Sequence, residues 1–129
     1  MFRKILLPEI IARQDGAGKE VALESGSKSM LLTLGITRII EKELLDVSVW
    51  GSSDGKHWKR IAAFPRKFYC GTYSMLLDLA QHPGIQFLRA QWKMDRWASE
   101  EQPKPLFGFY LHAEDVHSYD MRVRHAGAA

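Results

Sequence analysis

An alternation of apolar and polar side chains every second residue constrains this chain more than any other feature. Within the segment Ile85–Met94, apolar and polar positions alternate strictly from Leu88 onward. The apolar set is Leu88, Ala90, Trp92 and Met94, and the polar set is Arg89, Gln91 and Lys93. The segment Leu45–Val49 alternates in the same way. Successive side chains of a β-strand point to opposite faces, so this period predicts strands that bury one face.

Residues that favour turns separate the apolar segments, including Asp54-Gly55 and His82-Pro83-Gly84. We predict strands at Arg3–Leu7, Lys19–Leu23, Met30–Ile40, Leu45–Val49, Ile61–Phe64, Tyr73–Leu79, Ile85–Met94 and Leu106–Ala113. Short strands with turn signals between them are typical of an all-β fold, here an antiparallel β-sandwich of jelly-roll type with about eight strands. A helix over Ile36–Leu45 is the one local alternative, because Glu41, Lys42 and Glu43 favour helix.

The length of the chain fits one domain. Its 129 residues are close to the commonest domain size, and we expect residues 1–121 to form the sandwich and residues 122–129 to fray. The single cysteine, Cys70, excludes an intrachain disulfide, and we expect it to be half-buried among apolar groups.

Charge and hydrophobicity exclude several classes of partner. The net charge of +3 comes from basic residues interleaved with acidic ones, unlike the basic stripe of a nucleic-acid-binding protein. The apolar run Ile5–Leu7 is too short for a signal peptide, and no run approaches the roughly 18 apolar residues of a membrane span. We therefore expect a cytoplasmic protein with neither a nucleic-acid nor a membrane partner.

No motif predicts catalysis, a cofactor or a metal. Cys70 and His82 are close in sequence, but sequence proximity does not establish a nucleophile and its base. A cluster near the carboxyl end has the right residue types for metal binding but lacks the spacing of zinc sites, namely His112, Glu114, Asp115 and His117. We expect a protein that is not an enzyme.

The segment Leu45–Trp58 contains Ser-x-Asp-Gly-x-x-Trp after a strand, and Phe87-Leu-Arg-Ala90 follows later in the chain. With Leu32-Thr-Leu-Gly-Ile-Thr-Arg-Ile39 before them, these segments resemble the discoidin-like domains, also called coagulation-factor C-type or galactose-binding-like jelly rolls. The resemblance covers residues 30–113. It implies a binding module, and the lack of the disulfide found in many extracellular members implies an intracellular or bacterial relative.

Loops at one end of the sandwich are the predicted ligand site. Because strand direction alternates, loops 8–19, 41–43, 65–72 and 95–105 would share one end, and the segments 25–29, 54–55 and 81–84 the other. Aromatic and basic groups in the first set suit a sugar ring. The predicted ligand-binding residues are Arg66, Tyr69, Arg96 and Trp97, with Asp15 and Glu100 as hydrogen-bond acceptors. The alternative is that Phe68 and Trp97 only close the end of the core.

Two functions follow from these expectations. The first is carbohydrate binding through the loops just named. The second is a protein-interaction or homo-oligomerisation module, in which Trp50 and the outward faces of strands 45–50 and 85–94 bury against another copy.

Overall fold

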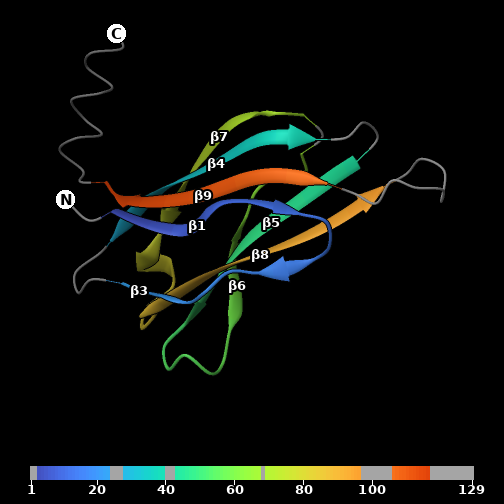
Figure 1. The fold of residues 1–129 in the computed structure, drawn as a ribbon. Helices are drawn as coiled ribbons and strands as arrows, with labels where there is room; N and C mark the ends of the chain where they lie inside the picture. Colours follow the sequence, from blue (N-terminus) through green and yellow to red (C-terminus); the bar gives the residue numbers. More distant parts are fainter. Residues whose placement is uncertain (1–2, 24–27, 40–42, 68, 97–105, 117–129) are drawn as a thin grey trace, which may run out of the picture.

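The computed structural model consists of two antiparallel β-sheets packed face to face (Figure 1). It describes residues 3–23, 28–39, 43–67, 69–96 and 106–116. The strands are β1 (Arg3–Ala12), β2 (Gly16–Ala17), β3 (Val21–Ala22), β4 (Ser29–Ile39), β5 (Glu43–Ser52), β6 (Lys59–Ala63), β7 (Gly71–Asp78), β8 (Phe87–Arg96) and β9 (Phe107–Asp115). A short 3₁₀ helix, η1 (Leu79–Gln81), follows β7.

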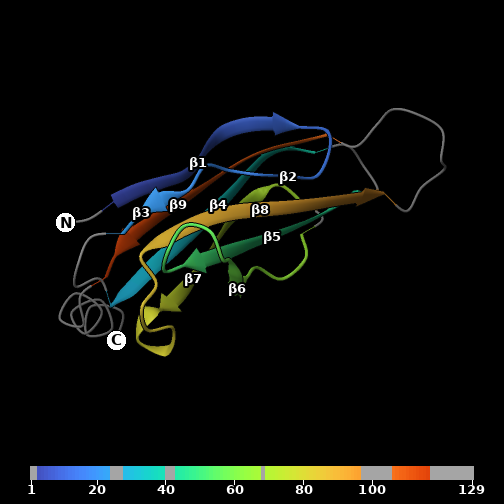
Figure 2. The same cartoon turned by 90° about the horizontal axis from the view of Figure 1, so that it is seen from below.

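The two sheets differ in size. One has the strand order β1-β9-β4-β7, and the other has the order β2-β8-β5-β6, with β3 also pairing with β8. Figure 2 shows β1 and β9 in one layer and β8 and β5 in the other. The predicted all-β antiparallel sandwich is confirmed. Among the described residues, no helix has the length and hydrophobicity needed to cross a bilayer.

Inward-facing residues of both sheets form one core. Those almost entirely excluded from solvent are Met30, Leu32 and Leu34 from β4, Leu45, Val47 and Val49 from β5, Leu88 and Ala90 from β8, and Phe107, Phe109, Leu111 and Ala113 from β9. These are the positions that the two-residue period selects, so the predicted facing of the alternating segments is confirmed. The indole of Trp92 meets the ring of Phe109 edge to face, with centroids 5.5 Å apart.

The amino-terminal segment differs from the prediction. The strand expected at Arg3–Leu7 continues through Pro8 to Ala12, so the first part of the expected loop 8–19 is a strand. Its pairing with β9 has register shifts between Ile5 and Leu7 and between Leu7 and Ile10. A proline lacks the N–H that a ladder needs, and an irregular edge strand is where the fold tolerates one.

The helix considered for Ile36–Leu45 is wrong. Strand β4 continues to Ile39 and β5 begins at Glu43, with residues 40–42 outside the described part. The described residues form nine strands, against about eight predicted, because the region before β4 supplies β2 and β3 as two separate short pieces. Burial of alternate β4 residues from Met30 to Ile36 favours strand over helix in the described part of this segment.

The Ser-x-Asp-Gly-x-x-Trp segment is a tightly bonded turn. The Ser52 hydroxyl is buried and accepts hydrogen bonds from the amides of Asp54, at 3.2 Å, and Gly55, at 2.8 Å. Asp54 Oδ1 accepts from the amides of Lys56 and His57. Gly55 has a φ of 78°, as expected for the Asp-Gly pair. Every one of these contacts stabilises the hairpin between β5 and β6, which gives the motif a structural role.

Strand pairing sets which loops share an end. Ser52 at the end of β5 pairs with Phe87 at the start of β8, so the turn after β5 and the segment before β8 are neighbours. At the opposite end, Leu45 pairs both with Met94 and, through an isolated bridge, with Lys67. The described parts of loops 65–72 and 95–105 therefore begin at the same end, as the alternation of strand direction predicts.

Candidate functional site

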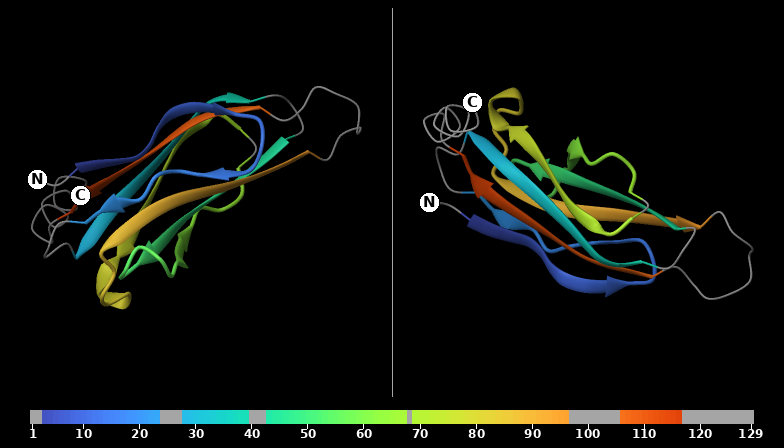
Figure 3. Two further views of the ribbon diagram at one scale, coloured as in Figure 1. Left: turned by 60° about the horizontal axis from the view of Figure 1, so that its bottom comes forward. Right: turned by 90° about the horizontal axis from the view of Figure 1, so that it is seen from above.

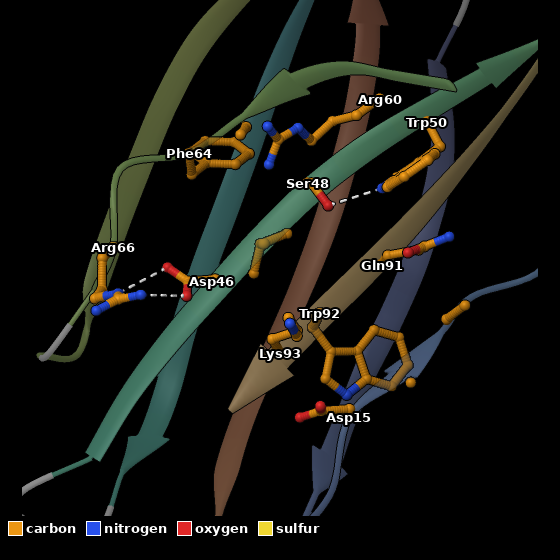
Figure 4. A pocket seen from close by; sticks show the side chains of 14 residues that line it. Asp15, Asp46, Ser48, Trp50, Arg60, Phe64, Arg66, Gln91, Trp92 and Lys93 are labelled. Carbon is orange, nitrogen blue, oxygen red and sulfur yellow. Dashed lines mark hydrogen bonds and ion pairs between the residues drawn. The ribbon is translucent and has the colours of Figure 1, made fainter. Parts of the chain in front are cut away.

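A groove of about 890 Å³ lies on the outward face of the five-stranded sheet (Figure 4). Alternate residues of β5 and β8 form its floor. Because the two strands are antiparallel neighbours, Asp46 lies opposite Lys93 and Ser48 lies opposite Gln91. The same alternation that buries Val47 and Val49 on the inner face presents these polar groups on the outer one.

Two segments flank this floor. The chain from β6 into the following loop supplies Arg60, Ala63, Phe64 and Arg66. On the other side are Asp15, Gly16 and Ala17, which lead into and form β2, next to Trp92 of β8. The indole of Trp92 donates a hydrogen bond to the carbonyl of Gln14 at 2.9 Å, which ties this segment to β8. Small residues on both flanks leave the space that the groove occupies.

Trp50 is the aromatic group on the floor of the groove. Its side chain is half-buried, and its Nε1 donates a hydrogen bond to the Ser48 hydroxyl at 3.0 Å. Its backbone neighbours across the sheet are Arg60 on β6 and Arg89 on β8. The hydrogen bond fixes the orientation of the indole along β5, as Figure 4 shows.

The two acids of the groove already have partners. Arg66 donates two hydrogen bonds to the carboxylate of Asp46, Nε to Oδ1 and Nη2 to Oδ2, each 3.1 Å long. This hydrogen bonding and the negative charge of Asp46 raise the pKa of Arg66. Asp15 Oδ1 accepts a hydrogen bond of 2.8 Å from the amide of Met94. Both carboxylates are thereby committed to holding neighbouring parts of the chain.

The basic groups of the groove are less occupied. Within the part of the chain that the structure describes, no carboxylate forms an ion pair with Arg60 or Lys93. Both side chains are exposed at the groove. The groove therefore offers two cationic donors, the aromatic side chains of Trp50, Phe64 and Trp92, and the amide of Gln91 to a ligand.

The structure brings together only some of the residues predicted for the site. Arg66 and Asp15 both line the groove, from opposite flanks. Tyr69 does not line it; its side chain is 76% exposed, and its carbonyl accepts a hydrogen bond from Tyr73. Arg96 ends β8 with its backbone opposite Glu43, and its side-chain surroundings lie outside the described part. Trp97 and Glu100 lie outside the described residues, as does Phe68.

The polar groove residues that the loop-based prediction omits lie on strands. They are Asp46, Ser48, Arg60, Gln91 and Lys93. A signal for four of them exists in the sequence, since the polar parity of segments 45–49 and 85–94 places Asp46, Ser48, Gln91 and Lys93 outward. What the sequence does not supply is that β5 and β8 are adjacent, because β6 and β7 lie between them along the chain.

Two further groups differ from or extend the sequence analysis. Cys70 is exposed, so its expected half-buried position is wrong; it immediately precedes β7 and points away from the core. His112 packs against Tyr110, with ring centroids 4.7 Å apart. The described residues contain no group of three or more His, Cys, Asp or Glu side chains arranged to hold a metal ion, and His117 is outside them.

No protein-family model and no curated protein matches this chain. Solved structures with a similar fold include a prophage protein and a viral protein. The crystal structure of the SPBc2 prophage-derived protein YomS aligns with a TM-score of 0.52 and 6% identity, covering 88% of this chain and 92% of that one. A chain from the structure of infectious bursal disease virus, Gx strain, aligns with the same TM-score and identity. That alignment covers 92% of this chain but only 32% of the viral one. At such low identity the likeness shows the fold alone.

Proposed function

We propose that this chain is a non-catalytic binding module whose groove on the five-stranded sheet takes a carbohydrate. The observation that carries the proposal is Trp50, an indole held by Ser48 on the floor of a groove that combines apolar and polar side chains. A sugar ring has an apolar face that stacks on an aromatic ring and hydroxyl groups that need directional partners. Gln91 and Arg60 supply such partners beside Trp50.

The free cations favour an acidic sugar. Arg60 and Lys93 carry charges that no described carboxylate balances, whereas Asp46 and Asp15 are already hydrogen-bonded. A carboxylate on the ligand would restore charge balance in the groove, and its hydrogen bonds to a guanidinium are stronger than neutral ones. The proposed ligand class is therefore a glycan containing uronic acid.

The resemblance to discoidin-like domains supports a binding role, although it points to the loops at one end of the sandwich. The groove is adjacent to that end, because Arg66 belongs to the loop after β6 and Asp15 to the segment before β2. Ligand contacts from those loops would extend the groove.

Calorimetric titration with oligogalacturonate tests the proposal, with a neutral oligosaccharide of the same length for comparison. We expect oligogalacturonate to bind and Trp50→Ala to abolish the binding heat. Trp58→Ala is the matched control, because Trp58 packs under the Arg89 guanidinium, 4.4 Å from its ring centroid, and does not line the groove. Absence of binding heat for both sugars, or equal loss in both variants, would contradict the proposal.

A homodimer through the Trp50 face, the alternative from the sequence, is less well supported by this geometry. Two hollow surfaces related by a two-fold axis meet at their rims and leave a gap between them. The groove is better suited to a convex or extended ligand than to a second copy of itself.

A further inference from the structure

The four sheet edges of the sandwich differ in how well they are protected from pairing with another strand. The edges are β1 and β7 in one sheet, and β6 and the β2/β3 pair in the other. An unprotected edge strand exposes unpaired N–H and C=O groups, so proteins usually shorten, charge, bulge or interrupt such strands.

Three of the edges have such protective features. Strand β1 contains Lys4, Pro8 and Glu9 and has two register shifts against β9. Strands β2 and β3 have only two residues each. Strand β6 has five residues and begins with the exposed pair Lys59 and Arg60. Each of these edges is therefore a poor template for a further strand.

Strand β7 carries none of them. It has eight residues, and its segment 71–77, Gly-Thr-Tyr-Ser-Met-Leu-Leu, contains no charged residue and no proline. It pairs with β4 over eight consecutive positions without a register shift, so it has no bulge. Figure 3 shows β7 at the margin of its sheet, beyond β4.

The side chains of β7 are also suited to contact. Its outward set, Thr72, Ser74 and Leu76, is exposed, and Leu76 remains 48% accessible to solvent. The inward residues Tyr73, Met75 and Leu77 pack on the core and hold the strand in place. An uncharged and partly apolar edge is thus presented to solvent over residues 71–77.

We propose that β7 pairs antiparallel with β7 of a second copy of this chain, joining the two four-stranded sheets into one of eight strands. An antiparallel pair is symmetric, so the uncharged segment 71–77 meets itself without like-charge repulsion. With the two-fold axis near Ser74, Leu76 of each copy lies opposite Thr72 of the other. The groove belongs to the other sheet, so this dimer leaves both grooves open.

The pairing also determines how far apart the two Cys70 thiols lie in the dimer. In this register Cys70 of one copy lies beside Asp78 of the other, and the two thiols are roughly 26 Å apart. The dimer therefore forms without a disulfide and persists in reducing agent.

Light scattering coupled to size exclusion, in reducing agent, tests the proposal on the full chain. We expect twice the chain mass of 14.8 kDa for the wild type. Ser74→Lys places two ammonium groups opposite each other and should give a monomer, as should Ser74→Glu. Mixing the two variants should restore the dimer, which excludes misfolding as the cause. Ile11→Lys, on the exposed surface of β1, is the matched control and should remain dimeric.

Several results would overturn the proposal. A wild-type chain that stays monomeric up to its solubility limit is one. A dimer that Trp50→Glu dissociates and Ser74→Lys leaves intact would place the interface on the groove. A dimer lost on addition of reducing agent would be a Cys70 disulfide. A monomer that binds an extended peptide of another protein at β7 would make the edge a site for a different partner.

Discussion

The outer faces of the two sheets are built on the same alternation and yet have opposite shapes. On the four-stranded sheet the outward position Gly35 is covered by the ring of Tyr110, which stacks on His112 and fills the surface. On the five-stranded sheet the flanking positions are small, including Ala63 and Ala17, and a groove remains. The four-stranded sheet is therefore level at Gly35, because the Tyr110 ring covers the glycine. The five-stranded sheet has a groove, because small residues without a covering ring lie on its flanks.

The comparison also separates two tryptophans. The ring of Trp92 packs against Phe109 in the core, and its indole N–H donates a hydrogen bond to the carbonyl of Gln14 on the flank of the groove. Trp50, by contrast, lies on the floor of the groove. Trp92 therefore stabilises the fold, whereas Trp50 would contact the ligand under the function proposed above.

The largest expected effect is on the groove side. Trp92→Ala should lower the free energy of unfolding by about 3 kcal/mol, because it removes a large ring packed against the core. Urea denaturation followed by circular dichroism measures this loss. Trp50→Ala should cost less than half as much, since Trp50 makes fewer core contacts. Equal losses for the two variants would remove the distinction between them.

The next effect is on the smooth face. A Cβ on Gly35 would overlap the ring of Tyr110, so Gly35→Ala should destabilise the fold by about 1–3 kcal/mol. In a Tyr110→Ala background the same change should cost much less, because the overlap is gone. Four urea denaturation curves complete this cycle. A cost that does not depend on Tyr110 would show that the ring does not determine the shape of this face.

A smaller effect is expected for the ion pair at the groove. The side chains of Arg66 and Asp46 are 55% and 37% exposed, so solvent screens their attraction. A double-mutant cycle with Arg66→Ala and Asp46→Ala should give a coupling energy much smaller than the loss expected for Trp92→Ala. Added salt should reduce it further. A coupling that is large and insensitive to salt would mean that the pair is a main support of the groove.

The smallest expected change in the free energy of unfolding comes from the turn between β5 and β6, which belongs to neither outer face. Hydrogen bonding to Asp54 and its negative charge raise the pKa of His57 above its ordinary value of 6.5. The pair therefore adds stability that is complete below pH 6.5 and is lost as the pH rises through the folded-state pKa. Hydrogen bonds from His57 and Lys56 lower the pKa of Asp54, so its contribution is present above its ordinary value of 3.8 and is lost in stronger acid.

Melting temperatures at pH 5 and pH 8 detect this difference. We expect the wild type to lose slightly more stability than His57→Gln as the pH rises between these values. The two chains should respond alike if the turn does not couple to the titration of His57.

The predictable part of this fold is the part that burial dictates. Leu88 and Ala90 are buried and Lys93 exposed because each inward position must be apolar for the sheets to pack. The second half of β1 could not be predicted in this way. Pro8 predicts the end of a strand, but β1 continues past it because an edge strand tolerates a proline. The two residues of β2 are too few to show any period.

The groove was less accessible to sequence reasoning than the core. Asp46, Ser48 and Gln91 are each recognisable as outward residues, but their meeting depends on β8 pairing with β5 across two intervening strands. Strand order is set by the packing of the whole sandwich and not by a local pattern. The residues predicted from loops, such as Arg66 and Asp15, reach the groove because those loops start beside it.

The central place of β9 has a consequence for how the molecule is made. Strand β9 lies between β1 and β4, and its residues 107–115 pair with residues 3–12 on one side and with β4 on the other. On a ribosome, β1 and β4 have no strand to join them until residue 115 has left the exit tunnel. That sheet therefore closes only after residues 3–115 have all been made, and such distant pairing makes folding slow compared with a helical protein of this size.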